Sequence, residues 1–127
     1  MSALDELASQ LRDEDTPISP HVVDPPEEAA FASPGERAFV IEAVREGYLL
    51  HYGEPRLLAG HDADLALLAG DYLYALGIER LARRGDTAAV HVLAELISTC
   101  AQLHTEGRED EVPAAWERAT QSLIGAI

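Results

Sequence analysis

The chain contains no lysine. Its nine basic residues are all arginine, they face 23 acidic residues, and the formal net charge is -14. Such an acidic surface repels phosphate groups, so nucleic acid is excluded as a general partner and anionic membrane surfaces are disfavoured. The single cysteine, Cys100, rules out an internal disulfide. Aromatic residues make up only 6% of the chain while alanine and leucine dominate, which favours closely packed helices over a sheet.

Long apolar runs are also missing, because Asp71 interrupts the most apolar stretch before it reaches the length of a membrane span. The first fifteen residues have neither a basic region nor an apolar run typical of a signal peptide, so we expect a cytoplasmic protein. Phosphate-binding glycine loops and the Gly-x-Ser-x-Gly nucleophile motif are absent as well.

Helical periodicity predicts an all-α fold, a helical bundle of four main helices plus a short N-terminal helix. Residues 1–12 form the short helix, with Ser2 and Asp5 as its capping box. Residues 13–33 hold four prolines and six acidic residues, which predicts an extended acidic linker or an arm that crosses to a partner. Residues 34–127 form the bundle domain.

The first main helix is expected to start at Ser33–Glu36, where Ser33 is the N-cap and Pro34 the first helical residue. It runs to about Tyr52, because Gly53 and a following proline end it. We expect Arg45 and Glu46 on its outer face. Its expected inward stripe consists of Ile41, Val44 and Tyr48.

The central helix is expected over Ala63–Arg84, and its first fifteen residues are apolar on nearly every side, which indicates a buried helix. A carboxylate in such a helix must be paired or face a polar cavity, so we expect Asp71 to be buried. Gly70 beside it permits close approach of another backbone. Gly70, Asp71 and Tyr72 are therefore the candidate ligand-binding or structural polar site. The expected donors to Asp71 are Arg37, Arg45, Arg56 or a capping hydroxyl.

Two further helices complete the prediction. The first, Thr87–Glu106, is capped by Asp86 and stopped by Gly107, and the last opens at Pro113. The expected core stripe of the first consists of Val90, Leu93, Ala94, Ile97, Cys100 and Ala101. The expected core face of the last consists of Trp116, Ala119, Leu123 and Ile127.

Potential metal ligands cluster at the start of the central helix, where His61, Asp62 and Asp64 lie together. A His-Asp pair binds a divalent metal in the all-helical HD phosphohydrolases, and the pair here resembles it. The alternative is that Asp62 or Asp64 interacts with the positive N-terminus of the helix. Spacings of four also relate His91 to Glu95 and Cys100 to His104. No three ligands share a clear face, so we expect no bound metal and no cofactor.

The stretch from Leu67 to Leu73, followed by Leu81-Ala82 and Gly85-Asp86, resembles one helix of the trans-isoprenyl diphosphate synthase (polyprenyl synthetase) family. With a tyrosine after Gly70-Asp71, it is most similar to the non-catalytic small subunit of heptaprenyl diphosphate synthase. The resemblance covers about residues 64–106 and implies an isoprenoid-synthase-like fold. The two Asp-Asp-x-x-Asp motifs that hold magnesium and diphosphate in catalytic members are absent.

The resemblance therefore implies a non-catalytic accessory subunit of a polyprenyl diphosphate synthase, or a helical homodimer, with a protein partner or a second copy and an isoprenoid as possible ligands. Two alternatives stay open at this point. One is a metal-dependent HD-type phosphohydrolase that uses His61 and Asp62. The other is an unrelated helical protein-interaction module.

Overall fold

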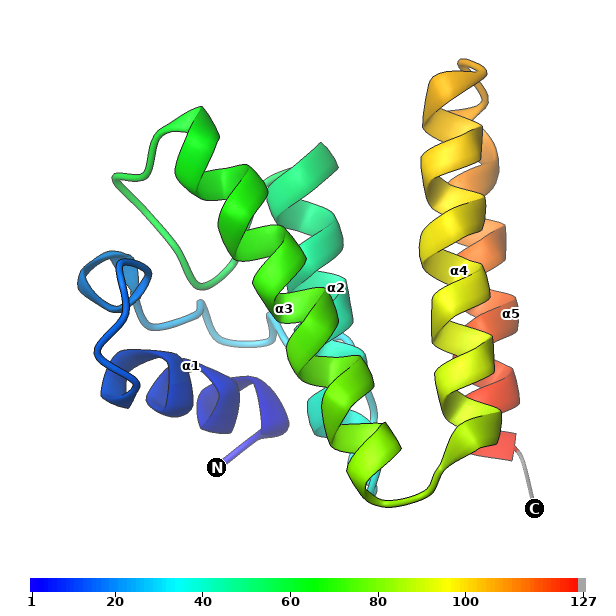
Figure 1. Cartoon of the computed structure of the whole chain (residues 1–127), viewed down its shortest axis with the longest axis horizontal. Helices are drawn as coiled ribbons and strands as arrows, with labels where there is room; N and C mark the ends of the chain where they lie inside the picture. The colour runs from blue at the N-terminus through cyan, green and yellow to red at the C-terminus, as the bar shows by residue number, and fades with distance from the viewer. Residues whose placement is uncertain (126–127) are drawn as a thin grey trace. The chain divides into compact units, whose positions relative to one another are not determined.

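The computed structural model describes residues 1–125, in which the regular elements are all helices and no strand is present, so the predicted all-α class is confirmed (Figure 1). The five expected helices are present, and two short 3-10 helices lie in the connections between the first and second helix and between the fourth and fifth. The elements in chain order are α1 (Ala3–Asp13), η1 (Ser19–His21), α2 (Ala38–Tyr52), α3 (Ala63–Arg83), α4 (Thr87–Thr105), η2 (Glu109–Glu111) and α5 (Val112–Gly125).

The chain divides into two compact units, residues 1–77 and residues 78–127, which are described separately. The boundary falls inside α3, within the range 34–127 that the sequence assigned to the bundle domain, after the short helix at 1–12 and the linker at 13–33. None of the helices in residues 1–125 combines the length and the apolar character that a membrane crossing requires.

Helix α1 starts with the predicted capping box. The Ser2 hydroxyl accepts from the Asp5 amide at 3.1 Å, and the Asp5 carboxylate accepts from the Ser2 amide at 3.1 Å. The Ser2 hydroxyl and amide lower the pKa of Asp5, because both donate hydrogen bonds to its charged form. The apolar stripe of α1 is buried in the core of the first unit, beside α2. Its members are Leu4, Leu7, Ala8 and Leu11.

The acidic, proline-rich segment that follows α1 packs on the first unit. Ile18 is buried in its core, and Val22 forms an isolated antiparallel bridge with Leu58. The Val23 amide donates to the Leu57 carbonyl at 2.7 Å, and the Ala59 amide donates to the His21 carbonyl at 3.0 Å. These backbone hydrogen bonds hold the segment against the loop between α2 and α3.

Helix α2 begins at Ala38, so the predicted start at Ser33 is wrong. The chain turns between Ser33 and Arg37 instead, and the Arg37 side chain makes no capping hydrogen bond. Most of α2 is buried, including both of its inward-facing glutamates, Glu42 and Glu46. The expected outward position of Glu46 is therefore also wrong.

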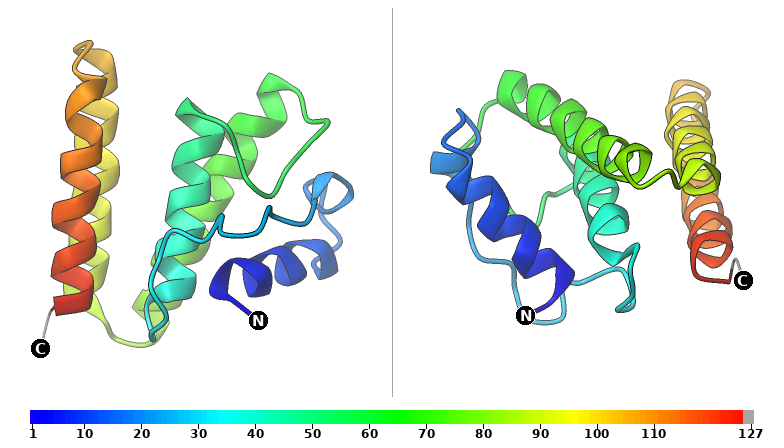
Figure 2. Two further views of the ribbon diagram at one scale, coloured as in Figure 1. Left: turned by 180° about the vertical axis from the view of Figure 1, so that it is seen from behind. Right: turned by 60° about the horizontal axis from the view of Figure 1, so that its bottom comes forward.

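Helix α3 is exposed along one side, which contradicts its predicted burial on every side. Ala69 and Leu73 lie in the core of the first unit, whereas Leu67 and Leu68 are exposed. As predicted, the helix ends before a left-handed Gly85, at φ 71°. In Figures 1 and 2, α3 lies beside α2 in each view.

The second unit contains the helical hairpin α4–α5 (Figure 2). Asp86 caps α4 by accepting from the Ala89 amide at 3.3 Å, as expected. The buried stripe of α4 is Ala89, Leu93, Leu96, Cys100 and Leu103. Ala94 and Ala101, which were expected in that stripe, are exposed, because alternating spacings of three and four direct the leucines to α5. In α5, Trp116 and Leu123 are buried as predicted, and Ile127 lies outside the described residues.

Candidate functional site

The site that the sequence indicated lies where α2 and α3 cross, and two glycines permit the crossing. A Cβ atom built on Gly47 would lie 2.9 Å from the Gly70 carbonyl oxygen and 2.8 Å from the Tyr74 ring. One built on Gly70 would overlap the His51 imidazole and lie 3.0 Å from the Gly47 carbonyl oxygen. The close approach expected at Gly70 is thus present, and its partner on α2 is Gly47.

His51 connects the two helices at this crossing. Its Nε2 lies 3.1 Å from the Leu67 carbonyl oxygen and 3.3 Å from Oδ1 of Asp71. The imidazole is nearly buried, and its ring lies edge-on to Tyr74 with centroids 5.2 Å apart. His51 therefore occupies the space that a side chain at position 70 would otherwise fill.

The prediction that Asp71 is buried is wrong, since 73% of its side chain is exposed. Its neighbour across the helix pair is His51 rather than one of the three arginines expected as donors. Asp71 points outward because it lies on the opposite side of α3 from the buried Ala69 and Leu73. Tyr72 is half-buried and packs against the core, so the three residues of the candidate site face different surroundings.

The outward side of α3 combines apolar and acidic residues. Leu67 is 56% exposed and Leu68 is 67% exposed, and both lie near the start of α3. We call this surface the α3 outer face. It consists of the exposed residues Asp64, Leu67, Leu68, Asp71 and Ala75.

A second charged group, which sequence reasoning missed, lies inside the first unit. Glu42 and Glu46 are fully buried, one helical turn apart on α2, and Arg56 lies between them. The guanidinium donates from NH1 to Oε1 of Glu42 at 2.8 Å and from Nε to Oε1 of Glu46 at 2.9 Å. The single guanidinium cation thus forms a charge-assisted hydrogen bond with each of the two buried carboxylates.

The remaining carboxylate oxygens accept backbone amides. Oε2 of Glu42 accepts from Phe31 and Ala32 at 2.7 and 3.1 Å. Oε2 of Glu46 accepts from Arg56 and Leu57, both at 2.8 Å. All four carboxylate oxygens thus have donors, and none is left to bind a ligand. The network is a structural clamp that holds two loops on α2.

The sequence did contain a signal for this clamp. Residues 38–44 of α2 are apolar except for Glu42, and a carboxylate in such surroundings must be paired or hydrogen-bonded, as Glu42 and Glu46 are. Arg56, one of the expected donors to Asp71, binds these two glutamates instead.

The candidate metal ligands at the start of α3 do not form a ligand set. Oδ1 of Asp62 accepts from the Leu65 amide at 2.8 Å, which makes Asp62 the N-cap of α3. Nδ1 of the half-buried His61 has no hydrogen-bond partner. Within residues 1–125, no group of three or more His, Cys, Asp or Glu side chains is placed to hold a metal ion.

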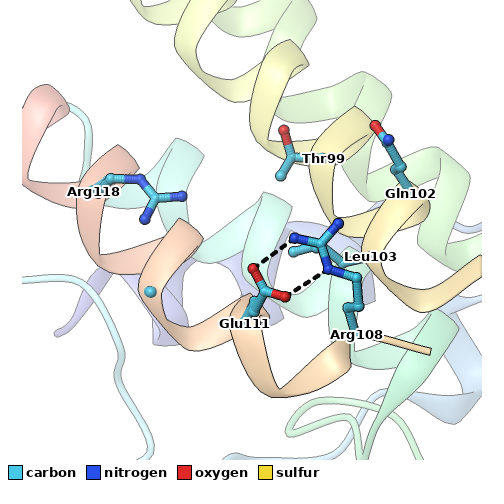
Figure 3. A pocket seen from close by; sticks show the side chains of 7 residues that line it. Thr99, Gln102, Leu103, Arg108, Glu111 and Arg118 are labelled. Carbon is cyan, nitrogen blue, oxygen red and sulfur yellow. Dashed lines mark hydrogen bonds and ion pairs between the residues drawn. The ribbon is translucent and has the colours of Figure 1, made fainter. Parts of the chain in front are cut away.

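Two shallow hollows lie on the α4–α5 hairpin, of about 320 and 280 Å³, and Thr99 and Arg118 border both. In the larger one Arg108 donates to Glu111 from Nε at 2.6 Å and from NH2 at 2.9 Å (Figure 3). These bonds lower the pKa of Glu111 and raise the pKa of Arg108. His91 and Glu95 line the smaller hollow. The lining of the larger hollow is mostly polar, that of the smaller one mixes polar and apolar residues, and neither lining contains a catalytic constellation.

Comparisons of this chain with family models, with curated proteins and with solved structures found no match.

Proposed function

We propose that this chain is a cytoplasmic, non-catalytic helical protein that acts through a protein partner, as an accessory subunit of a polyprenyl diphosphate synthase. The observation that carries the proposal is the α3 outer face. Leu67 and Leu68 expose apolar surface directly beside Asp71, within the stretch that resembles the synthase family. Contiguous exposed apolar patches rimmed by polar residues are typical of protein–protein interaction surfaces, and Leu67 and Leu68 are neighbours in the chain.

The charged groups of the first unit support a non-catalytic role. Its buried carboxylates are hydrogen-bonded to Arg56 and to backbone amides, and the Asp62 carboxylate caps the N-terminus of α3. Ionisation of an allylic diphosphate requires several carboxylates around metal ions, and the chain lacks the Asp-rich motifs that supply them. The phosphohydrolase alternative has no described ligand set beyond the His61–Asp62 pair, so we do not favour it.

Capture of the partner tests this proposal. The affinity-tagged protein, expressed in its native host, is compared with the variant Leu67→Ser/Leu68→Ser and with Ile124→Ser. Ile124 is a matched control because it lies on α5 and is 56% exposed, the same fraction as Leu67. We expect wild type and Ile124→Ser to retain a polyprenyl diphosphate synthase chain with Asp-rich motifs, and the double variant to lose it.

The possible outcomes distinguish the general proposal of an accessory role from the specific assignment to a polyprenyl diphosphate synthase. A captured partner of another class that depends on Leu67 and Leu68 would refute the synthase assignment and leave the accessory role. Equal capture by all three proteins, or turnover of allylic diphosphates by the purified chain with magnesium, would refute the accessory role. Because both leucines are exposed, the double variant is expected to fold like wild type, to within about 0.5 kcal/mol per substitution.

A further inference from the structure

We infer that the α3 outer face binds an amphipathic helix of another protein that carries lysine or arginine beside its apolar stripe. This inference rests on the proposed function and specifies the chemistry of the partner. The α3 outer face spans residues 64–75, a length of about 16 Å at 1.5 Å per residue. That length accommodates about three turns of a partner helix.

The apolar part of the surface fits a helix better than an extended strand. Leu67 and Leu68 are adjacent and form a pair of knobs, whereas Ala75, two turns further along, leaves room for large partner side chains. No backbone group of an α-helix middle is free to pair with a strand, so recognition must come from side chains. An apolar stripe on a partner helix provides such side chains at spacings of three and four residues.

The negative charge of the α3 outer face favours a different protein over a second copy of this chain as the binding partner. Asp64 and Asp71 lie seven residues apart, so they share one side of α3 and flank the two leucines. In a symmetric dimer the same patch meets itself, which would bring these carboxylates toward one another. Each copy also carries a net charge of -14, so self-association is opposed over the whole surface. Asp71 already has His51 as a neighbour at 3.3 Å, but its side chain remains 73% exposed, so a basic partner can pair with both Asp64 and Asp71 and is attracted to the chain at long range.

A pair of model peptides tests the inference directly. The first is an 18-residue helical peptide with leucines at positions i, i+3, i+4 and i+7 and lysines on both sides of that stripe. The second replaces every lysine with glutamate. Binding of each fluorescein-labelled peptide to the full chain is measured by anisotropy, at low and at high salt. The variants are Leu67→Ser/Leu68→Ser and Asp64→Asn/Asp71→Asn. Their matched controls are Ile124→Ser and Glu117→Gln, both at exposed positions on α5.

We expect the lysine peptide to bind and the glutamate peptide not to bind. The leucine variant should weaken binding about tenfold or more, because buried apolar area is lost at both positions. The aspartate variant should weaken it about three- to tenfold and reduce the salt dependence, since exposed charges are screened by salt. Both control variants should bind like wild type.

Several results would overturn the inference. They are equal binding of the two peptides, equal losses in the α5 controls, or a leucine-dependent dimer of the chain in sedimentation equilibrium. If the lysine peptide fails while native capture still depends on Leu67 and Leu68, the partner chemistry is wrong and the proposed function stands. If the lysine peptide does not bind and native capture does not depend on Leu67 and Leu68, the α3 outer face is not an interaction surface.

Discussion

Arg56→Ala is expected to lower the free energy of unfolding of the first unit by about 3–5 kcal/mol, the range measured when one member of a buried ion pair is removed. The substitution leaves Glu42 and Glu46 fully buried without their shared cation. It also frees the Ala29 carbonyl, which accepts from NH1 of Arg56 at 3.0 Å. Denaturant unfolding by near-ultraviolet circular dichroism measures the effect, because all four tyrosines lie in the first unit.

Arg12→Ala is the matched control. Arg12 pairs with Asp24 at 3.1 Å in the same unit, but both side chains are exposed, so we expect a loss of at most about 1 kcal/mol. Replacing all three clamp residues with apolar ones should not restore stability. Four backbone amides, at residues 31, 32, 56 and 57, would lose their carboxylate acceptors. An Arg56→Ala variant as stable as Arg12→Ala would show that the clamp is not structural.

Gly47→Ala is expected to destabilise the first unit by about 1–3 kcal/mol, as overpacking does in well-packed cores. The new methyl group would press on the Gly70 carbonyl, a backbone atom that cannot rotate away. This strain opposes the gain of up to about 1 kcal/mol that alanine brings within a helix. The same denaturant experiment measures it, and stabilisation by Gly47→Ala would contradict the close crossing of α2 and α3.

A double-mutant cycle at Gly70 and His51 sharpens this test. The methyl group that Gly70→Ala introduces would first contact the His51 imidazole. His51→Ala should therefore reduce the destabilisation caused by Gly70→Ala. His51→Ala should not relieve Gly47→Ala in the same way, because the obstructing carbonyl remains. Additive effects of Gly70→Ala and His51→Ala would mean that the imidazole does not fill the space over Gly70.

The features that were predicted correctly depend on neighbours in the sequence. The capping box at Ser2 and Asp5, the cap at Asp86 and the left-handed exit at Gly85 each involve residues within one helical turn. Such local hydrogen bonds and backbone preferences can be read from residue types and spacing. The all-α class followed in the same way from the absence of alternating β-branched runs.

The features that the sequence did not predict, the exposed side of α3 and the buried glutamates of α2, depend on which of these two apolar helices is enclosed by the rest of the first unit. Both α2 and α3 are rich in apolar residues, and periodicity alone does not say that α2 is enclosed while Leu67 and Leu68 face outward. For the same reason, the apolar pattern predicts a buried carboxylate at Asp71, whereas the buried carboxylates are Glu42 and Glu46. Their cation, Arg56, lies beyond the end of α2, so the pairing requires the tertiary fold.

Site-specific photo-crosslinking tests the central claim, that the α3 outer face binds a protein partner, most directly. The photoreactive residue p-benzoylphenylalanine is placed at position 68 or, as control, at position 124 of the full chain in its native host. We expect irradiation to link position 68 to one partner protein through a lysine- or arginine-containing helix, and position 124 to leave that partner unlinked. No adduct at position 68, or the same adduct from both positions, would contradict the claim.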